Sequence, residues 1–123
     1  MALFDIVLRN GRVLDPETRM DKITNIGLIG DSIDAITSES IEGHYTIDAT
    51  GLVIAPGAID MHSHGQNDEN YRIQAKDGVT TALELEVGVL DIDDWYDSRK
   101  GKSLINFGAS VGHIPVRKQV MRD

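Results

Sequence analysis

The order of segments after Pro56 constrains the fold of this chain more than any other feature. Apolar, β-branched stretches alternate there with short stretches of helical character. A strand that returns through a helix to a neighbouring strand runs parallel to it. We therefore predict parallel strands joined by crossover helices. The expected strands are residues 57–64, 79–87 and 103–112, and the expected helices are residues 67–78, 91–101 and 115–123.

Capping residues support these helices. Asn67 or Asp68 can accept a hydrogen bond at the start of the first helix, and Gly78 can close its end. The second helix has an acidic start and Gly101 as its stop, as the helix dipole favours. Pro115 suits the first turn of the third helix, because proline lacks the N–H that is unpaired there.

The first half of the chain predicts only short strands. Asn10-Gly11 lies between the strand-like segments 4–9 and 12–15, which predicts a hairpin turn at that dipeptide. A second turn is expected at Gly30-Asp31. Strands of this length with glycine and asparagine between them favour a β-sandwich or barrel-like layer. The domains are accordingly predicted as a β-rich segment, 1–55, and an α/β segment, 56–123.

Composition narrows the classes of partner. The 123 residues carry a net charge of −8 without a long basic block, which argues against nucleic acid and anionic membranes. The N-terminus lacks a secretory apolar core, so a cytoplasmic protein is expected. There is no cysteine, so a metal would have to be held by His, Asp or Glu.

The stretch from Ala55 to Asp68, APGAIDMHSHGQND, carries the first candidate site residues. Side chains two apart on a strand share a face. Asp60, His62 and His64 are therefore expected on one face, where two imidazoles can converge on a cation. Asp60 is a candidate for orienting one of the two rings.

The next two expected strands carry further candidates. Glu84 and Glu86 share a face of the second strand, and Glu86 lies nearer its end. His113 follows the third strand. Parallel α/β folds build their sites at the carboxyl ends of strands, so these residues could meet the two histidines. The alternatives are histidines at a loop mouth, carboxylates solvated on an edge strand, and a structural His113.

The segment GLVIAPGAIDMHSH resembles the signature of the amidohydrolase superfamily, P-G-x-I-D-x-H-x-H. In that superfamily the signature closes an N-terminal β-layer and forms the first strand of a (β/α)8 barrel. DGVTTALELEVG and LINFGASVGHIPVR are most similar to N-acyl-D-amino-acid deacylases. Those enzymes carry a metal-bridging cysteine where this sequence has Glu86. No lysine falls near that position, so dihydroorotases and hydantoinases, which use a carboxylated lysine, match less well.

The resemblance implies that His62, His64 and Glu86 hold one or two divalent ions, with zinc expected, which activate water to attack an amide. It places a proton-shuttling aspartate on a later strand. A whole barrel needs roughly 250 residues, so its remainder is expected as a partner, as a separate polypeptide if the enzyme is split. Homo-oligomers stay open. The alternatives are a cyclic-amide hydrolase like dihydroorotase, a scaffold protein that has lost the metal, and a free-standing β-rich binding module.

Overall fold

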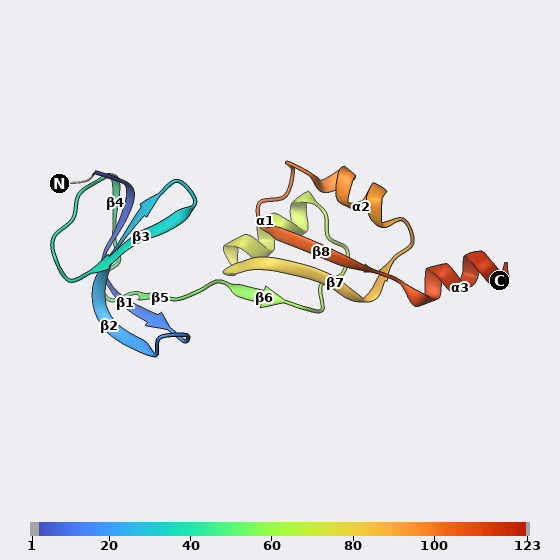
Figure 1. The fold of residues 1–123 in the computed structure, drawn as a ribbon, viewed down its shortest axis with the longest axis horizontal. Helices are drawn as coiled ribbons and strands as arrows, with labels where there is room; N and C mark the ends of the chain where they lie inside the picture. The colour runs from blue at the N-terminus through green and yellow to red at the C-terminus, as the bar shows by residue number, and fades with distance from the viewer. Residues whose placement is uncertain (1–2, 123) are drawn as a thin grey trace. The chain divides into compact units, whose positions relative to one another are not determined.

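The computed structural model describes residues 3–122, which lie in two compact units, Met1–Pro56 and Gly57–Asp123 (Figure 1). Each unit has its own sheet. The first unit is all β, and the second is a mixture of strands and helices. The predicted α/β character of the second half is thereby confirmed.

The first unit is a five-stranded sheet in the order β3-β2-β1-β4, with β5 paired to β1. The pairs β1–β2 and β2–β3 are antiparallel, whereas β4 and β5 run parallel to β1. The predicted turn at Gly30-Asp31 is confirmed, with Gly30 at a φ of 58°. The second layer of a sandwich stays a prediction. The strands are β1 (Phe4–Asp15), β2 (Met20–Ile29), β3 (Ser32–Thr37), β4 (Gly43–Asp48) and β5 (Val53–Ile54).

The predicted hairpin at Asn10-Gly11 is wrong. β1 continues through both residues, and the turn to β2 lies at residues 16–19 instead. Asn10 has a φ of 60° because the strand has a bulge between Leu8 and Gly11, and a bulge needs the same left-handed backbone as a turn. The N–H of Asn10 donates to Oδ1 of Asn25 at 2.9 Å. The side chain of Asn25 thus accepts the backbone hydrogen bond that Asn10 cannot make within the strand ladder.

The core of this sheet is small. Phe4, Val7 and Ile41 are its buried apolar cluster, and Ala35 packs against them. A Cβ at Gly27 would lie 2.6 Å from the ring of Phe4, so the absence of a side chain there lets the ring cross β2.

The second unit contains the parallel sheet β6-β7-β8, in sequence order. The helices α1 and α2 cover one face of it, because Phe107 of β8 packs against Tyr71 of α1 and Trp95 of α2 (ring centroids 6.3 and 5.7 Å apart). The predicted β-α-β-α-β-α order is confirmed. The elements are β6 (Ala58–Asp60), α1 (Asp68–Lys76), β7 (Val79–Val89), α2 (Ile92–Arg99), β8 (Asn106–Val111) and α3 (His113–Met121).

The caps of the helices follow the sequence prediction closely. Asn67 caps α1, its Oδ1 accepting from the N–H of Asn70 at 3.0 Å, and Asp91 caps α2 in the same way. Gly78 follows the end of α1 at a φ of 84°. Pro115 lies in the first turn of α3. Within residues 3–122, none of the helices has the length and apolar character needed to cross a membrane.

Candidate metal centre

The two histidines of the H-x-H motif lie in a loop, and the prediction that they lie on a strand is wrong. β6 ends at Asp60, whose Oδ1 accepts a hydrogen bond from the backbone N–H of His62 at 3.0 Å. That contact bends the chain away from the ladder. The N–H of Ser63 still reaches the carbonyl of Leu83 at 3.1 Å, so the loop stays against β7. We call residues 61–67 the histidine loop.

Glu86 meets both histidines at the carboxyl end of the sheet. Its Oε2 lies 3.4 Å from Nε2 of His62 and 3.2 Å from Nε2 of His64. The two imidazoles stand nearly perpendicular, at 85°, with centroids 4.8 Å apart. One donor atom from each of the three residues lies within 4.8 Å of the others. The loop after β6 and the strand β7 therefore bring three ligand-type atoms to one exposed point.

These donor atoms suit a zinc-like cation in chemistry, and the two separations that involve Glu86 suit it in spacing. Zinc takes imidazole nitrogen and carboxylate oxygen at about 2.0–2.2 Å, and a tetrahedral arrangement then separates neighbouring donors by about 3.3 Å. The two separations from Glu86, 3.2 and 3.4 Å, agree with that value. Catalytic zinc sites commonly have three protein ligands and one open position. His62, His64 and Glu86 are also exposed, so an ion and a substrate can reach them.

Glu84 holds the ring of His64 from the other side. Both of its carboxylate oxygens lie 3.0 Å from Nδ1 of His64, and its side chain is only 11% exposed. The hydrogen bond that His64 donates to the Glu84 carboxylate raises the pKa of His64 above its ordinary value, and the charges of Glu84 and Glu86 add to this effect. With a proton held on Nδ1, the Nε2 atom is the one available to a cation. Carboxylates that accept a hydrogen bond from the second ring nitrogen of a metal-binding histidine have this geometry.

A bulge in β7 shapes the segment around Glu86. The pairing of β7 with β8 shifts register between Glu84 and Val89, and Gly88 has a φ of 67°. A Cβ at Gly88 would lie 2.7 Å from the backbone of Gly112, so only glycine allows the strands to approach there. The N–H of Gly88 faces Oε1 of Glu84 at 3.4 Å. Bulges of this kind re-aim side chains beside active sites. The strand pattern of residues 79–87 did not predict this bulge, although Gly88 was a signal of it.

The other two candidates are placed differently. Asp60 contacts the main chain of His62, and its Oδ2 lies 3.4 Å from Nε2 of Gln74, so Glu84 rather than Asp60 orients an imidazole. His113 is the first residue of α3. It lies outside the three-residue group found among residues 3–122.

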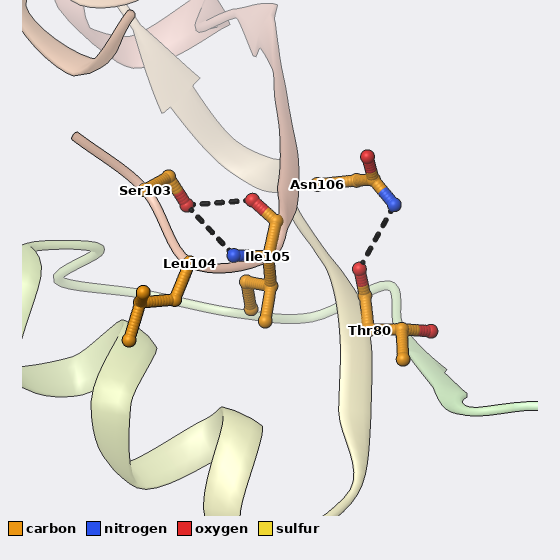
Figure 2. A pocket seen from close by; sticks show the side chains of 5 residues that line it. All are labelled: Thr80, Ser103, Leu104, Ile105 and Asn106. Atoms are coloured by element: carbon orange, nitrogen blue, oxygen red, sulfur yellow. Dashed lines mark hydrogen bonds between the residues drawn. The ribbon is translucent and has the colours of Figure 1, made fainter. Parts of the chain in front are cut away.

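A separate hollow lies at the opposite end of these strands. Figure 2 shows its lining, in which Nδ2 of Asn106 donates to the carbonyl of Thr80 at 3.1 Å. Thr80 is near the start of β7 and Asn106 begins β8, whereas the metal-type group lies at the carboxyl ends. The hollow therefore does not belong to the candidate centre. It is lined by Thr80, Ser103, Leu104, Ile105 and Asn106.

Comparison with known proteins agrees with this arrangement. Residues 45–109 match the model of the amidohydrolase family, which covers more than half of the chain. The chain therefore belongs to the amidohydrolase family. The similarity to D-aminoacylases is confirmed as well. The D-aminoacylase of Alcaligenes xylosoxydans xylosoxydans is 30% identical, over 98% of this chain and 31% of that protein.

Two further proteins resemble this chain. A dihydroorotase of Streptococcus pneumoniae is 45% identical over 48% of this chain and 14% of that protein. The crystal structure of an N-acyl-D-glutamate deacylase from Bordetella bronchiseptica, complexed with zinc and a phosphonate inhibitor, superposes with a TM-score of 0.83 at 22% identity. That match covers 99% of this chain and 32% of that chain. The chain thus spans about a third or less of the length of these relatives.

Proposed function

We propose that this chain supplies the first metal ligands of a zinc-dependent amidohydrolase that cleaves an amide bond of an N-acyl-D-amino acid or a closely related compound. The observation that carries the proposal is the convergence of His62, His64 and Glu86 at the carboxyl ends of β6 and β7. That position is where parallel α/β folds place their catalytic groups. Membership of the amidohydrolase family supports the same chemistry.

Each residue has a distinct part in this proposal. His62 and His64 offer Nε2 lone pairs, and Glu86 offers a carboxylate oxygen between them. Glu84 keeps a proton on Nδ1 of His64 and so fixes which nitrogen faces the ion. The bound cation supplies Lewis-acid activation of water and of the scissile carbonyl. The residue that moves the proton to the leaving amine is expected on a later strand of the barrel.

The relatives support the preferred substrate class. The relative that is 30% identical over nearly the whole chain is named a D-aminoacylase, which favours an acylated D-amino acid as the substrate. The dihydroorotase favours a second candidate, the hydrolysis of a cyclic amide. Against that candidate, β7 has the sequence VTTALELEVGV and offers Glu86, not a lysine that could be carboxylated.

A partner is expected on the second unit: the remainder of the (β/α)8 barrel, in the same or a separate polypeptide. The sheet β6-β7-β8 has two open edges, and apolar side chains remain exposed on and beside it. Parallel strands are normally paired at their edges and covered on both faces, so further strands and helices are expected to pack there. The exposed residues include Ile59 (62%), Leu85 (45%), Val87 (43%) and Val111 (56%).

Zinc binding by the 123-residue chain tests the proposed centre directly. Native mass spectrometry after zinc addition is expected to show a zinc adduct that His64→Ala removes. His44→Ala is the matched control, because His44 is exposed on β4 of the first unit. The proposal is contradicted if the parent chain binds no zinc, or if His64→Ala binds zinc as well as the parent chain does. Either result favours a scaffold protein.

Activity of the complete enzyme tests the substrate class. A panel of N-acetyl-D-amino acids, their L-enantiomers and dihydroorotate separates the two candidates. We expect release of the free D-amino acid and no opening of the cyclic amide. The reverse result would replace the deacylase proposal with the cyclic-amide one.

A further inference from the structure

The histidine loop has two faces with different surroundings. His62 and His64 are exposed and point toward the carboxylate of Glu86. Ser63 and Gln66 are buried, at 4% and 3% exposure, on the side of α1 and α2. Most buried polar side chains in proteins are hydrogen-bonded. Their partners therefore show what holds the loop in shape.

Gln66 makes three separate connections. Its Oε1 accepts from the hydroxyl of Tyr71 at 2.9 Å, and its Nε2 donates to the carbonyl of Ser63 at 3.3 Å. Its own carbonyl accepts from Nη2 of Arg99 at 2.7 Å. The loop is thus closed on itself between Ser63 and Gln66, and is fixed to α1 and α2 at the same residue.

Arg99 is itself held in place by contacts with Trp95. Its guanidinium lies over the ring of Trp95, 4.1 Å from the centroid, and its Nη1 donates to the carbonyl of Trp95 at 3.1 Å. A planar guanidinium that stacks and donates in two directions has little freedom left. Tyr71 is equally constrained, being 1% exposed and packed against Phe107. Burial raises the pKa of Tyr71, so its hydroxyl remains a neutral donor.

Gln74 adds a second anchor nearer to the strand. Its Nε2 donates to Oγ of Ser63 at 2.9 Å and lies 3.4 Å from Oδ2 of Asp60. Asp60 in turn accepts from the N–H of His62. The main chain on both sides of each histidine is therefore fixed by groups that do not touch the candidate metal position.

We propose that Gln66, Tyr71 and Arg99 are positioning residues, which set the histidine loop so that Nε2 of His62 and of His64 converge before a metal binds. This inference rests on the proposed metal centre. A loop fixed in advance loses little conformational entropy on binding, so its ligands bind the ion more tightly than the same histidines on a mobile loop. Arg99 also links the loop to α2, 33 residues further along the chain.

Zinc affinity in matched tyrosine variants tests the inference. Tyr71→Phe removes only the hydroxyl that donates to Gln66 and keeps the ring against Phe107. Tyr96→Phe is the control, because its hydroxyl contacts the N–H of Ala109 on β8 and not the loop. Competition with a chromophoric chelator is expected to show zinc affinity reduced about 10- to 100-fold in Tyr71→Phe and unchanged in Tyr96→Phe.

Two further measurements separate positioning from general stability. Hydrogen exchange of the metal-free chain is expected to speed up in residues 61–67 of Tyr71→Phe, while the strand amides of β7 keep their protection. Arg99→Lys retains the charge and the N–H donors of a single nitrogen, so it is expected to bind zinc more tightly than Arg99→Met. The visible spectrum of bound cobalt is expected to change in Arg99→Met, reporting altered ligand geometry.

The outcomes distinguish the two proposals. Tight zinc binding in the parent chain with equal affinity and equal loop exchange in Tyr71→Phe overturns the positioning role and leaves the metal centre standing. A loss of affinity shared by Tyr96→Phe overturns it too, because the effect is then one of stability. A parent chain that binds no zinc overturns the metal centre and the positioning role with it.

Discussion

Replacing Glu84 with glutamine tests how much the carboxylate behind His64 contributes to metal binding. Both oxygens of Glu84 lie 3.0 Å from Nδ1, and the side chain is 11% exposed, so the contact is charge-assisted and sheltered from solvent. Glutamine keeps the size and one acceptor but loses the charge, which roughly halves the strength of such a bond. It also weakens the electron donation that makes Nε2 a good ligand.

The expected loss is 10- to 100-fold in zinc affinity, or about 1.4–2.7 kcal/mol. Competition with a chromophoric chelator at neutral pH measures it, and circular dichroism verifies that the variant is folded. Glu69→Gln is the control, since Glu69 is an exposed residue of α1 and carries the same charge. If Glu84→Gln binds zinc within about twofold of the parent chain, or if Glu69→Gln loses as much affinity, the carboxylate of Glu84 does not support the metal site.

Three further predictions concern stability and protonation. Val7 is fully buried, so Val7→Ala is expected to lower the free energy of unfolding by about 2–3 kcal/mol in urea titrations; a loss under about 0.5 kcal/mol would contradict that core. A Cβ at Gly57 would overlap the side chain of Thr80, so Gly57→Ala should destabilise by about 1–3 kcal/mol, with partial recovery when Thr80→Ala is added. The hydrogen bond and charge of Arg12 lower the pKa of Asp21, so the ionised carboxyl stabilises the fold. This stabilisation is fully present at pH values above the pKa of Asp21 in the unfolded chain, and it is lost as the pH falls through the pKa in the folded chain. Arg12→Gln is expected to raise the Asp21 pKa in an NMR titration, and an unchanged value would show that the pair does not persist in solution.

The parts of the fold that depend on local sequence were predictable. Asn67 and Asp91 cap their helices because their side chains reach the free N–H groups of the first turn, which requires no distant partner. Gly30 and Gly78 both adopt positive φ where the chain must turn. The parallel order of β6, β7 and β8 follows from strands that alternate with helices.

Features that depend on a distant partner were not predictable in the same way. Asn10-Gly11 satisfies a turn and a bulge equally well, and the side chain of Asn25, on the neighbouring strand, accompanies the bulge. The strand rule placed His62 and His64 on one face, but the hydrogen bond from His62 to Asp60 ends β6 early. The convergence of the two rings therefore comes from the loop rather than from strand alternation.

Different forces place the two halves of the candidate centre, and this explains why the histidines and Glu86 can meet. Glu86 is carried by a strand whose bulge is fixed by backbone packing at Gly88. The histidines are carried by a loop fixed by side chains, above all the contacts of Gln66. A substitution that loosens the loop can therefore weaken a metal site while the sheet keeps its stability. Separate measurements of zinc affinity and unfolding free energy are accordingly expected to diverge for loop variants and to fall together for variants of the sheet.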